Sequence, residues 1–134
     1  MWHVLEHFHR PSDYASEIKR LLKPGGICIA ALPNCNSHDS RHYGKEWAAW
    51  DVPRHLWHFK PGTFRLFAEK EGFIVRNIKP LPLDVFYISA LSEKNRQSPI
   101  PFLKGMIKGS FFALKSLSDK ERSSSLVYFL ERKN

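Results

Sequence analysis

Several short motifs that mark nucleotide-binding or hydrolytic enzymes are missing from this 134-residue chain. It has no G-x-G-x-x-G, no Walker motif, no C-x-x-C and no G-x-S-x-G. Dinucleotide and phosphate cradles, paired-cysteine sites and the nucleophile elbow are therefore not indicated. Gly25-Gly26 is not a phosphate cradle either, because it ends a helical pattern instead of starting one. Internal repeats and low-complexity tracts are also absent.

Cysteine is scarce, since only Cys28 and Cys35 are present. Two cysteines exclude a disulfide scaffold and favour a reducing compartment, so we expect a cytoplasmic protein. The sequence has no signal-peptide pattern at its start. The most apolar stretch, residues 100–117, contains three lysines, and we expect no membrane association.

Clustered positive charge is lacking, although the chain carries 21 basic and 13 acidic residues. The basic residues are scattered, whereas nucleic-acid-binding proteins concentrate them on one surface. We therefore expect no nucleic-acid partner. A hydrophobic fraction of 43% suits one folded domain over residues 1–134.

The stretch from Leu21 to Asn34 predicts an α/β architecture. Pro24 and two glycines end a helix and allow a tight turn. Residues 27–32 form an apolar run without alternation, which is typical of a strand buried on both faces. Pro33 ends that strand and leaves Asn34 at its carboxyl end, where ligands bind in open α/β sheets.

The remaining pattern predicts further helices and strands. Apolar spacing indicates a helix that starts near residues 11–13 with Tyr14, Ile18, Leu21 and Leu22 on its inner face. Residues 36–60 have no clear period and read as an aromatic-rich irregular segment. The other expected elements are helices at 61–72 and 102–117 and strands at 73–79 and 125–130. Residues 83–94 favour a helix, although residues 85–88 alone also fit a strand.

The last expected helix places Leu103, Met106, Ile107, Ser110 and Leu114 on one face. Gly105 and Gly109 form a G-x-x-x-G within the same helix, and we interpret it as close packing and not as membrane dimerisation.

Histidines supply the candidate chemistry. His3, Glu6 and His7 match H-x-x-E-H, in which two histidines one helical turn apart hold zinc and the glutamate acts as base. Pro11 limits such a helix, and a zinc-dependent hydrolase is the most distant alternative. His55 and His58 suit metal binding or acid–base chemistry, or they hold a loop through backbone hydrogen bonds; both interpretations stay open.

A resemblance to a known family rests on these stretches in this order. They are Val4-Leu5-Glu6-His7, Leu22-Lys23-Pro24-Gly25-Gly26, Pro33-Asn34 and residues 51–59, DVPRHLWHF. Together they resemble the C-terminal half of class I S-adenosylmethionine-dependent methyltransferases, in the branch that includes ubiquinone-biosynthesis O-methyltransferases. That resemblance implies a partial Rossmann-like sheet.

The family sheet has strand order 3-2-1-4-5-7-6 with strand 7 antiparallel. By resemblance, residues 27–32 are strand 5, residues 73–79 strand 6 and residues 125–131 strand 7. Residues 1–3 are the tail of strand 4 or lie just beyond it. Strands 1 to 3, the glycine-rich loop and the acidic ribose-binding residue have no counterpart, so the S-adenosylmethionine site is incomplete. We expect strand 5 to expose an edge and to mediate self-association.

The resemblance also implies roles for individual residues. Cofactor contacts fall on Trp2, His3 and Val4. Glu6, His7, Asn34 and Arg54 line the acceptor side, and His55 or His58 is the base; no metal ligand is implied. We expect the intact parent to methylate a small molecule and this chain alone to be inactive or to bind cofactor weakly. The alternative is a non-catalytic remnant or interaction module.

Overall fold

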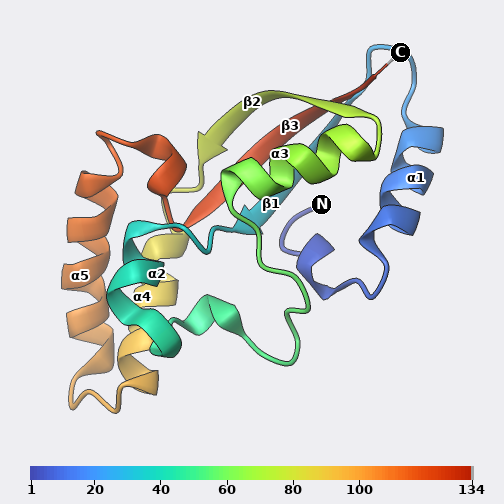
Figure 1. Ribbon diagram of the computed structural model, residues 1–134. Coiled ribbons are helices and arrows are strands. Elements are labelled where there is room, and N and C mark those ends of the chain that lie inside the picture. The colour runs from blue at the N-terminus through green and yellow to red at the C-terminus, as the bar shows by residue number, and fades with distance from the viewer. Residues whose placement is uncertain (134) are drawn as a thin grey trace.

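The sheet forms around a strand that comes late in the chain. A computed structural model describes residues 1–133, and within them the sheet has three strands in the order β1 (Ile27–Pro33), β3 (Ser125–Arg132), β2 (Phe73–Pro80). β3 runs antiparallel to both neighbours (Figure 1). This order and direction confirm the predicted assignment of these strands to family strands 5, 7 and 6.

The first residues of the chain pair with the free edge of β1. Trp2 and Ala31 form a parallel bridge, in which Ala31 donates to the Met1 carbonyl and His3 donates to the Ala31 carbonyl. The edge that we expected to be bare is therefore covered at this point. The Met1 ammonium group also donates to the Ile29 carbonyl at 2.7 Å. Farther back, Ile27 is 54% exposed. Self-association through this edge stays a prediction.

Burial of β1 differs from the prediction along its length. Ala30, Ala31 and Leu32 are at most 1% exposed, as expected of a strand covered on both faces. The first half, which contains the exposed Ile27, is not covered. The prediction of a strand buried on both faces is therefore confirmed only near the carboxyl end of β1.

One hydrophobic core joins the sheet to two helices, α1 (Pro11–Leu21) and α3 (Pro61–Lys70). Phe64 of α3 is fully buried and its ring lies 4.2 Å from that of Tyr128 on β3. Ala15 of α1 is buried in the same cluster. The predicted inner face of α1 is partly wrong, since Tyr14 and Leu21 are largely exposed.

The helices α4 (Asp84–Asn95) and α5 (Pro101–Lys115) form an antiparallel hairpin on the left of Figure 1. In the sequence this hairpin connects β2 to β3. Gly105 and Gly109 of α5 face α4, and a Cβ added at Gly105 would lie 2.3 Å from Cα of Ala90. This geometry agrees with the interpretation of the G-x-x-x-G as a site of close packing.

The apolar face expected on α5 forms, but it is turned to solvent. Its large members are exposed, among them Leu103 at 55%, Ile107 at 63% and Leu114 at 67%. Gly105 and Gly109 face α4 instead, because only residues without a Cβ let the backbones of α4 and α5 approach so closely.

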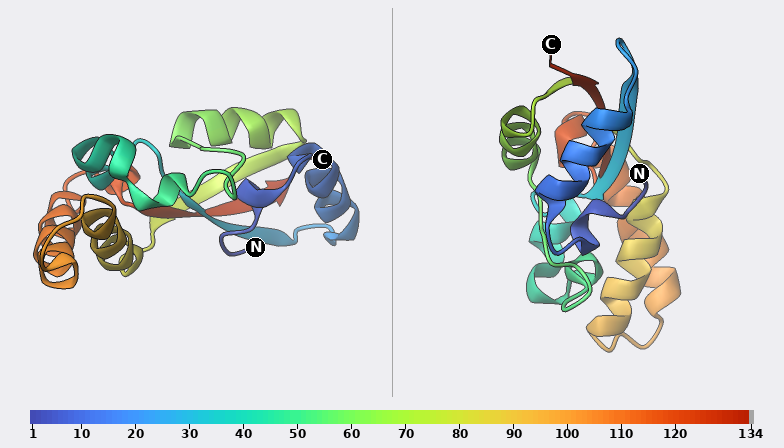
Figure 2. Two further views of the ribbon diagram at one scale, coloured as in Figure 1. Left: turned by 90° about the horizontal axis from the view of Figure 1, so that it is seen from below. Right: turned by 90° about the vertical axis from the view of Figure 1, so that its right-hand side faces the viewer.

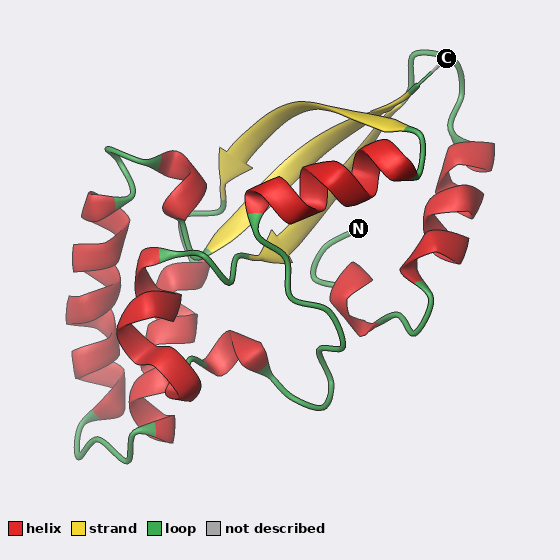
Figure 3. Ribbon diagram, in the orientation of Figure 1, coloured by secondary structure: helices red, strands yellow, loops and turns green. Residues whose placement is uncertain are grey.

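The segment that looked irregular is ordered by its aromatic side chains. It contains α2 (His38–Tyr43) and two short 3₁₀ turns, η2 (Gly44–Glu46) and η3 (Ala48–Trp50). Trp47 is 1% exposed and donates through Nε1 to Asp39 at 2.7 Å. These aromatics form a second core with α4 and α5. The helices α2, α4 and α5 lie together beside the sheet (Figures 2 and 3).

Two further 3₁₀ turns, η1 (Leu5–His7) and η4 (Lys120–Arg122), flank the strands. Among residues 1–133, none of the helices combines the length and apolarity that crossing a membrane requires.

We predict that Gly105→Ala destabilises the protein by about 1–3 kcal/mol, because the added methyl group would overlap the backbone of α4. Gly62→Ala is the matched control, since a Cβ there meets nothing within 4 Å. It should stabilise by less than about 1 kcal/mol through helix propensity. Urea unfolding measures both, and equal effects would contradict the close approach of α4 and α5.

Candidate active site

A cavity of about 330 Å³ lies at the carboxyl end of β1, where Pro33 forms part of its wall. Its other walls come from the N-terminal segment, from the loop after η3 and from α4. The polar side chains that line it are His3, Asp51, Arg54, His55, Asp84 and Tyr87. Its position agrees with the prediction that ligands bind at this strand end.

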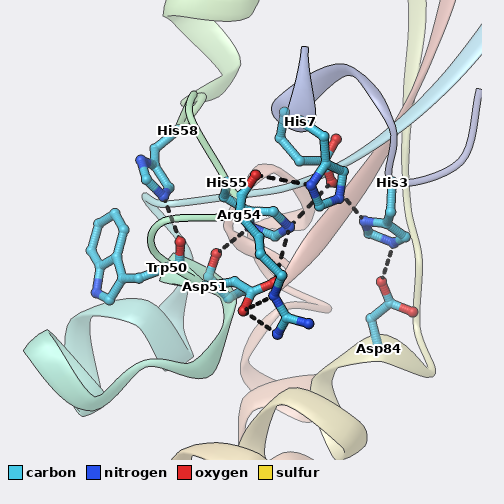
Figure 4. Close-up of polar contacts among 10 residues, drawn as sticks. His3, His7, Trp50, Asp51, Arg54, His55, His58 and Asp84 are labelled. Atoms are coloured by element: carbon cyan, nitrogen blue, oxygen red, sulfur yellow. Dashed lines mark hydrogen bonds and ion pairs between the residues drawn. The ribbon is translucent and has the colours of Figure 1, made fainter. Parts of the chain in front are cut away.

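His3 connects the N-terminal segment to α4. Its backbone has a φ of 50°, and its Nε2 lies 2.8 Å from Oδ2 of Asp84 (Figure 4). Its Nδ1 lies 3.4 Å from Oε1 of Glu6. The Asp84 hydrogen bond, and then the nearby Glu6 carboxylate, outweigh burial and raise the pKa of His3 from 6.5 to about 9. His3 is therefore a cation at neutral pH.

Glu6 is the most deeply buried charged residue of the site, with 1% exposure. Within the described part of the chain, neither carboxylate oxygen has a hydrogen-bond partner. Oε1 lies 3.9 Å from Nε2 of His55. The Glu6 backbone carbonyl accepts from Leu56 and Trp57, so this residue joins the N-terminal segment to the loop that carries His55.

His7 and His55 meet edge to face, with ring centroids 4.7 Å apart. Nδ1 of His7 lies 3.0 Å from the Arg54 carbonyl, and Nδ1 of His55 lies 2.9 Å from the Ala49 carbonyl. A carbonyl oxygen can only accept, so in each neutral ring the proton is assigned to Nδ1. Each Nε2 then keeps a free lone pair.

The loop itself is held by a local ion pair. Asp51 has a φ of 41° and accepts hydrogen bonds from the guanidinium of Arg54. Its second oxygen lies 3.8 Å from Nε2 of His55. Two carboxylates, those of Glu6 and Asp51, thus face the same imidazole nitrogen.

His58 is separated from His55 despite their close spacing in sequence. Its Nε2 lies 2.8 Å from the Trp50 carbonyl, and its ring packs on that indole at 4.9 Å (Figure 4). The side chain is exposed and turned toward Trp50, away from the residues that line the cavity. Of the two histidines predicted as bases, His55 is the one at the cavity.

Asn34 is buried at the end of β1, and its side chain forms hydrogen bonds with the main chain. Its Nδ2 donates to the carbonyls of Glu121 and Ser123 at 2.8 and 2.9 Å, and its Oδ1 accepts from the Asn36 amide. These bonds tie β1 to the segment that precedes β3. The side chain of Asn34 therefore has a structural role, and its predicted contact with the acceptor stays a prediction.

Trp2 and Val4 lie beside the edge of β1, with exposures of 55% and 36%. Their predicted cofactor contacts stay predictions.

The H-x-x-E-H interpretation is wrong as a helical zinc motif. Only the single 3₁₀ turn Leu5–His7 forms, and His3 precedes it in a left-handed conformation that directs its side chain to Asp84. His3 and His7 therefore do not share a helix face. His7 instead meets His55, a pairing that the sequence spacing could not reveal.

A family model described as "Methyltransferase domain" matches residues 1–78. That match spans β1, the loop of residues 51–60 that carries His55 and His58 (the histidine loop), α3 and most of β2. The chain belongs to the methyltransferase-domain family. The resemblance drawn from the sequence is thus confirmed at the level of the family.

Solved structures support the fold of this methyltransferase domain. The putative methyltransferase of Haloferax volcanii, solved in a complex with the Trm112 activator, gives a TM-score of 0.58 at 16% identity. The [4+2]-cyclase SpnF gives 0.55 at 16%, and phosphoethanolamine N-methyltransferase 2 of Haemonchus contortus with S-adenosyl-L-methionine gives 0.52 at 17%. No curated protein sequence matches the chain significantly.

Each alignment includes 98% or 99% of this chain. It covers 52% of the Haloferax volcanii protein, 47% of SpnF and 32% of the Haemonchus contortus enzyme. It therefore spans about half or less of each neighbour. A cyclase among the neighbours also illustrates that the fold alone does not decide the activity.

Sequence reasoning missed Asp84 and Tyr87, which α4 contributes to the cavity. Both lie outside the residues that the family model matches. No local signal marks them, because the contact between His3 and Asp84 exists only once α4 is folded against the N-terminal segment.

We predict that Asp84→Asn lowers the pKa of His3 from about 9 toward 6.5, because the neutral amide no longer favours the imidazolium. Proton NMR titration of the His3 ring in metal-free buffer measures this change. Asp13→Asn, at an exposed carboxylate of α1, is the control and should leave His3 unchanged.

Protein stability should follow the same ionisation. A raised folded-state pKa contributes stability that is fully present below 6.5 and is lost as the pH rises through about 9. The free energy of unfolding should therefore fall across that window, and by less in Asp84→Asn. Titration of the unmodified His3 near 6.5 would contradict the prediction.

Proposed function

We propose that the intact protein transfers the methyl group of S-adenosylmethionine to a small molecule bound in the cavity between His3, His55 and α4. The observation that carries this proposal is the methyltransferase family match over residues 1–78, which includes β1 and the loops that line the cavity. A structural neighbour described in complex with S-adenosyl-L-methionine adds support for that cofactor.

The cofactor would pass beside the N-terminal segment. Trp2 and Val4 offer exposed apolar surface there, next to the carboxyl half of β1. These residues suit one wall of a cofactor site. Among residues 1–133, no strand is followed by a glycine-rich loop and a helix that would supply the other walls. The chain by itself is therefore expected to bind S-adenosylmethionine weakly or not at all.

The acceptor would meet a cavity that contains both charge signs. The cations His3 and Arg54 are each paired with a carboxylate that also lines the cavity, an arrangement that suits a strongly polar acceptor. In-line methyl transfer needs mainly positioning, and these fixed charges can orient such an acceptor.

His55 is the candidate base for an acceptor that must lose a proton. Its Nδ1 is held by the Ala49 carbonyl, which leaves the Nε2 lone pair available. The carboxylates of Glu6 and Asp51, each under 4 Å from Nε2, would stabilise the imidazolium formed by proton uptake. His58, turned toward Trp50, is less well placed.

Calorimetric titration with S-adenosylmethionine and S-adenosylhomocysteine tests the cofactor proposal. It should be performed on residues 1–134 and on the longest product of the reading frame that contains them. We expect tight binding by a product that includes a glycine-rich strand, loop and helix. Binding by neither protein would contradict methyl transfer and favour a non-catalytic remnant or interaction module.

We predict that His55→Gln lowers kcat by about 100-fold or more for acceptors that lose a proton, the scale of general base catalysis. Release of S-adenosylhomocysteine with a panel of phenols, amines and carboxylic acids measures the rate. Cofactor affinity should be unchanged. His9→Gln, at an exposed histidine outside the cavity, is the matched control. Equal rates for His55→Gln and the control would remove His55 as the base.

A further inference from the structure

Three potential metal ligands converge where the N-terminal segment meets the histidine loop. The ligand atoms offered by Glu6, His7 and His55 all lie within 4.8 Å of one another. Glu6 and His7 are neighbours on η1, and His55 comes from the loop that η1 contacts through the Glu6 carbonyl. The rings of His7 and His55 lie side by side in Figure 4. This set shares two residues with the H-x-x-E-H sequence but replaces His3 with His55.

Both imidazoles are already oriented as metal ligands usually are. A metal-bound histidine typically donates its other ring N–H to a carbonyl or carboxylate, which fixes the ring and its tautomer. His7 and His55 each place Nδ1 on a backbone carbonyl, at 3.0 and 2.9 Å. The nitrogen left with a lone pair is Nε2 in both rings, and that of His55 faces Glu6.

The carboxylate of Glu6 is buried without a hydrogen bond within residues 1–133. It is 1% exposed. Burying a carboxylate in this way is costly unless a counter-charge or ligand compensates it. The His3 imidazolium, 3.4 Å from Oε1, supplies part of the compensation but is itself hydrogen-bonded to Asp84.

The spacing requires only a small contraction around an ion. Ligand atoms at about 2.0–2.1 Å from one tetrahedral zinc ion lie roughly 3.3 Å apart, so the widest separation must close by roughly 1.5 Å. His7 is exposed and can move by rotation of its side chain. Glu6 and His55 stay held by their backbone contacts.

We propose that Glu6, His7 and His55 bind one divalent transition-metal ion, for which zinc is the best match. Two imidazoles and one carboxylate suit zinc, whereas magnesium and calcium prefer oxygen ligands. Of the other carboxylates, that of Asp51 has its Oδ2 3.8 Å from Nε2 of His55. The site goes beyond the proposed methyl transfer and requires no cofactor.

Occupation of this site has a consequence for the proposed base. One lone pair on His55 Nε2 cannot accept both a metal ion and a proton. The metal-loaded protein would therefore hold no free base at His55.

Calorimetric titration of the untagged chain with zinc chloride, without S-adenosylmethionine, tests the site. We expect one ion per chain, and a cobalt-loaded sample should show the visible absorption of a coordinated ion with nitrogen ligands. His7→Gln and His55→Gln should each weaken binding by more than about 100-fold, which exceeds the cost of losing an outer-shell partner. His9→Gln, two residues from His7 and exposed, should bind as the unmodified chain does.

His7→Gln decides the test, because an exposed side chain can be replaced without unfolding the chain, and circular dichroism verifies the fold. Glu6→Gln should also abolish binding; should it unfold, the two histidine variants still decide. Absence of zinc binding by the folded, unmodified chain would overturn the proposal. So would binding that His7→Gln and His55→Gln leave unchanged. Because no cofactor is present, either result leaves the methyl-transfer proposal to its own experiment.

Discussion

The pairing of β3 with two neighbours is the constraint on which the rest of the structure depends. β1 and β2 do not pair with each other, and each forms its ladder with β3. Leu126 and Tyr128 on β3 are at most 1% exposed, and Tyr128 packs against Phe64. Without β3, therefore, both the sheet and the surface under α3 would be lost.

Contacts around η4 hold the chain in place as it enters β3. Asn34 binds carbonyls on that segment, and Arg65 of α3 forms an ion pair with Glu121. The buried Asn34 bonds are worth more than the ion pair, which is partly exposed to solvent. The end of β1, and with it the wall of the cavity, is thus positioned by residues almost 90 positions away.

The candidate site is organised mainly by the main chain. Carbonyls orient both histidines, and the Glu6 carbonyl joins η1 to the loop after η3. Such contacts fix ring positions without enclosing the rings. The functional side chains therefore remain available while their geometry is set by backbone that ligands do not displace.

Much of the fold could be predicted because its signals are local. The apolar run of β1, its glycine turn and the strand assignments required only neighbouring residues and the family pattern. Other features depend on competition between two local signals. On α5 the apolar face that contains Leu103 and Leu114 and the pair Gly105–Gly109 both have helical spacing. Only the contact of Gly105 with Ala90 shows which of the two packs against α4. The cap of α2, in which Ser37 accepts from Ser40, lay hidden in an aromatic-rich segment.

The site was predictable in its residue types but not in its groupings. Glu6, His7 and His55 were all candidates, yet their convergence depends on a contact between segments about 50 residues apart. His55 and His58 would share a face of a helix, whereas the loop that they occupy turns their side chains apart. Spacing indicates geometry only where the backbone is regular.

The central place of β3 also bears on how the protein is made. A ribosome synthesises β1 and β2 well before β3, so both strands emerge before their shared partner exists. Until residues 125–132 appear, Leu32 and Phe73 have no sheet to pack in. Stable folding must then wait for the whole length of the α4–α5 hairpin, an interval in which exposed strands are open to aggregation and to chaperones.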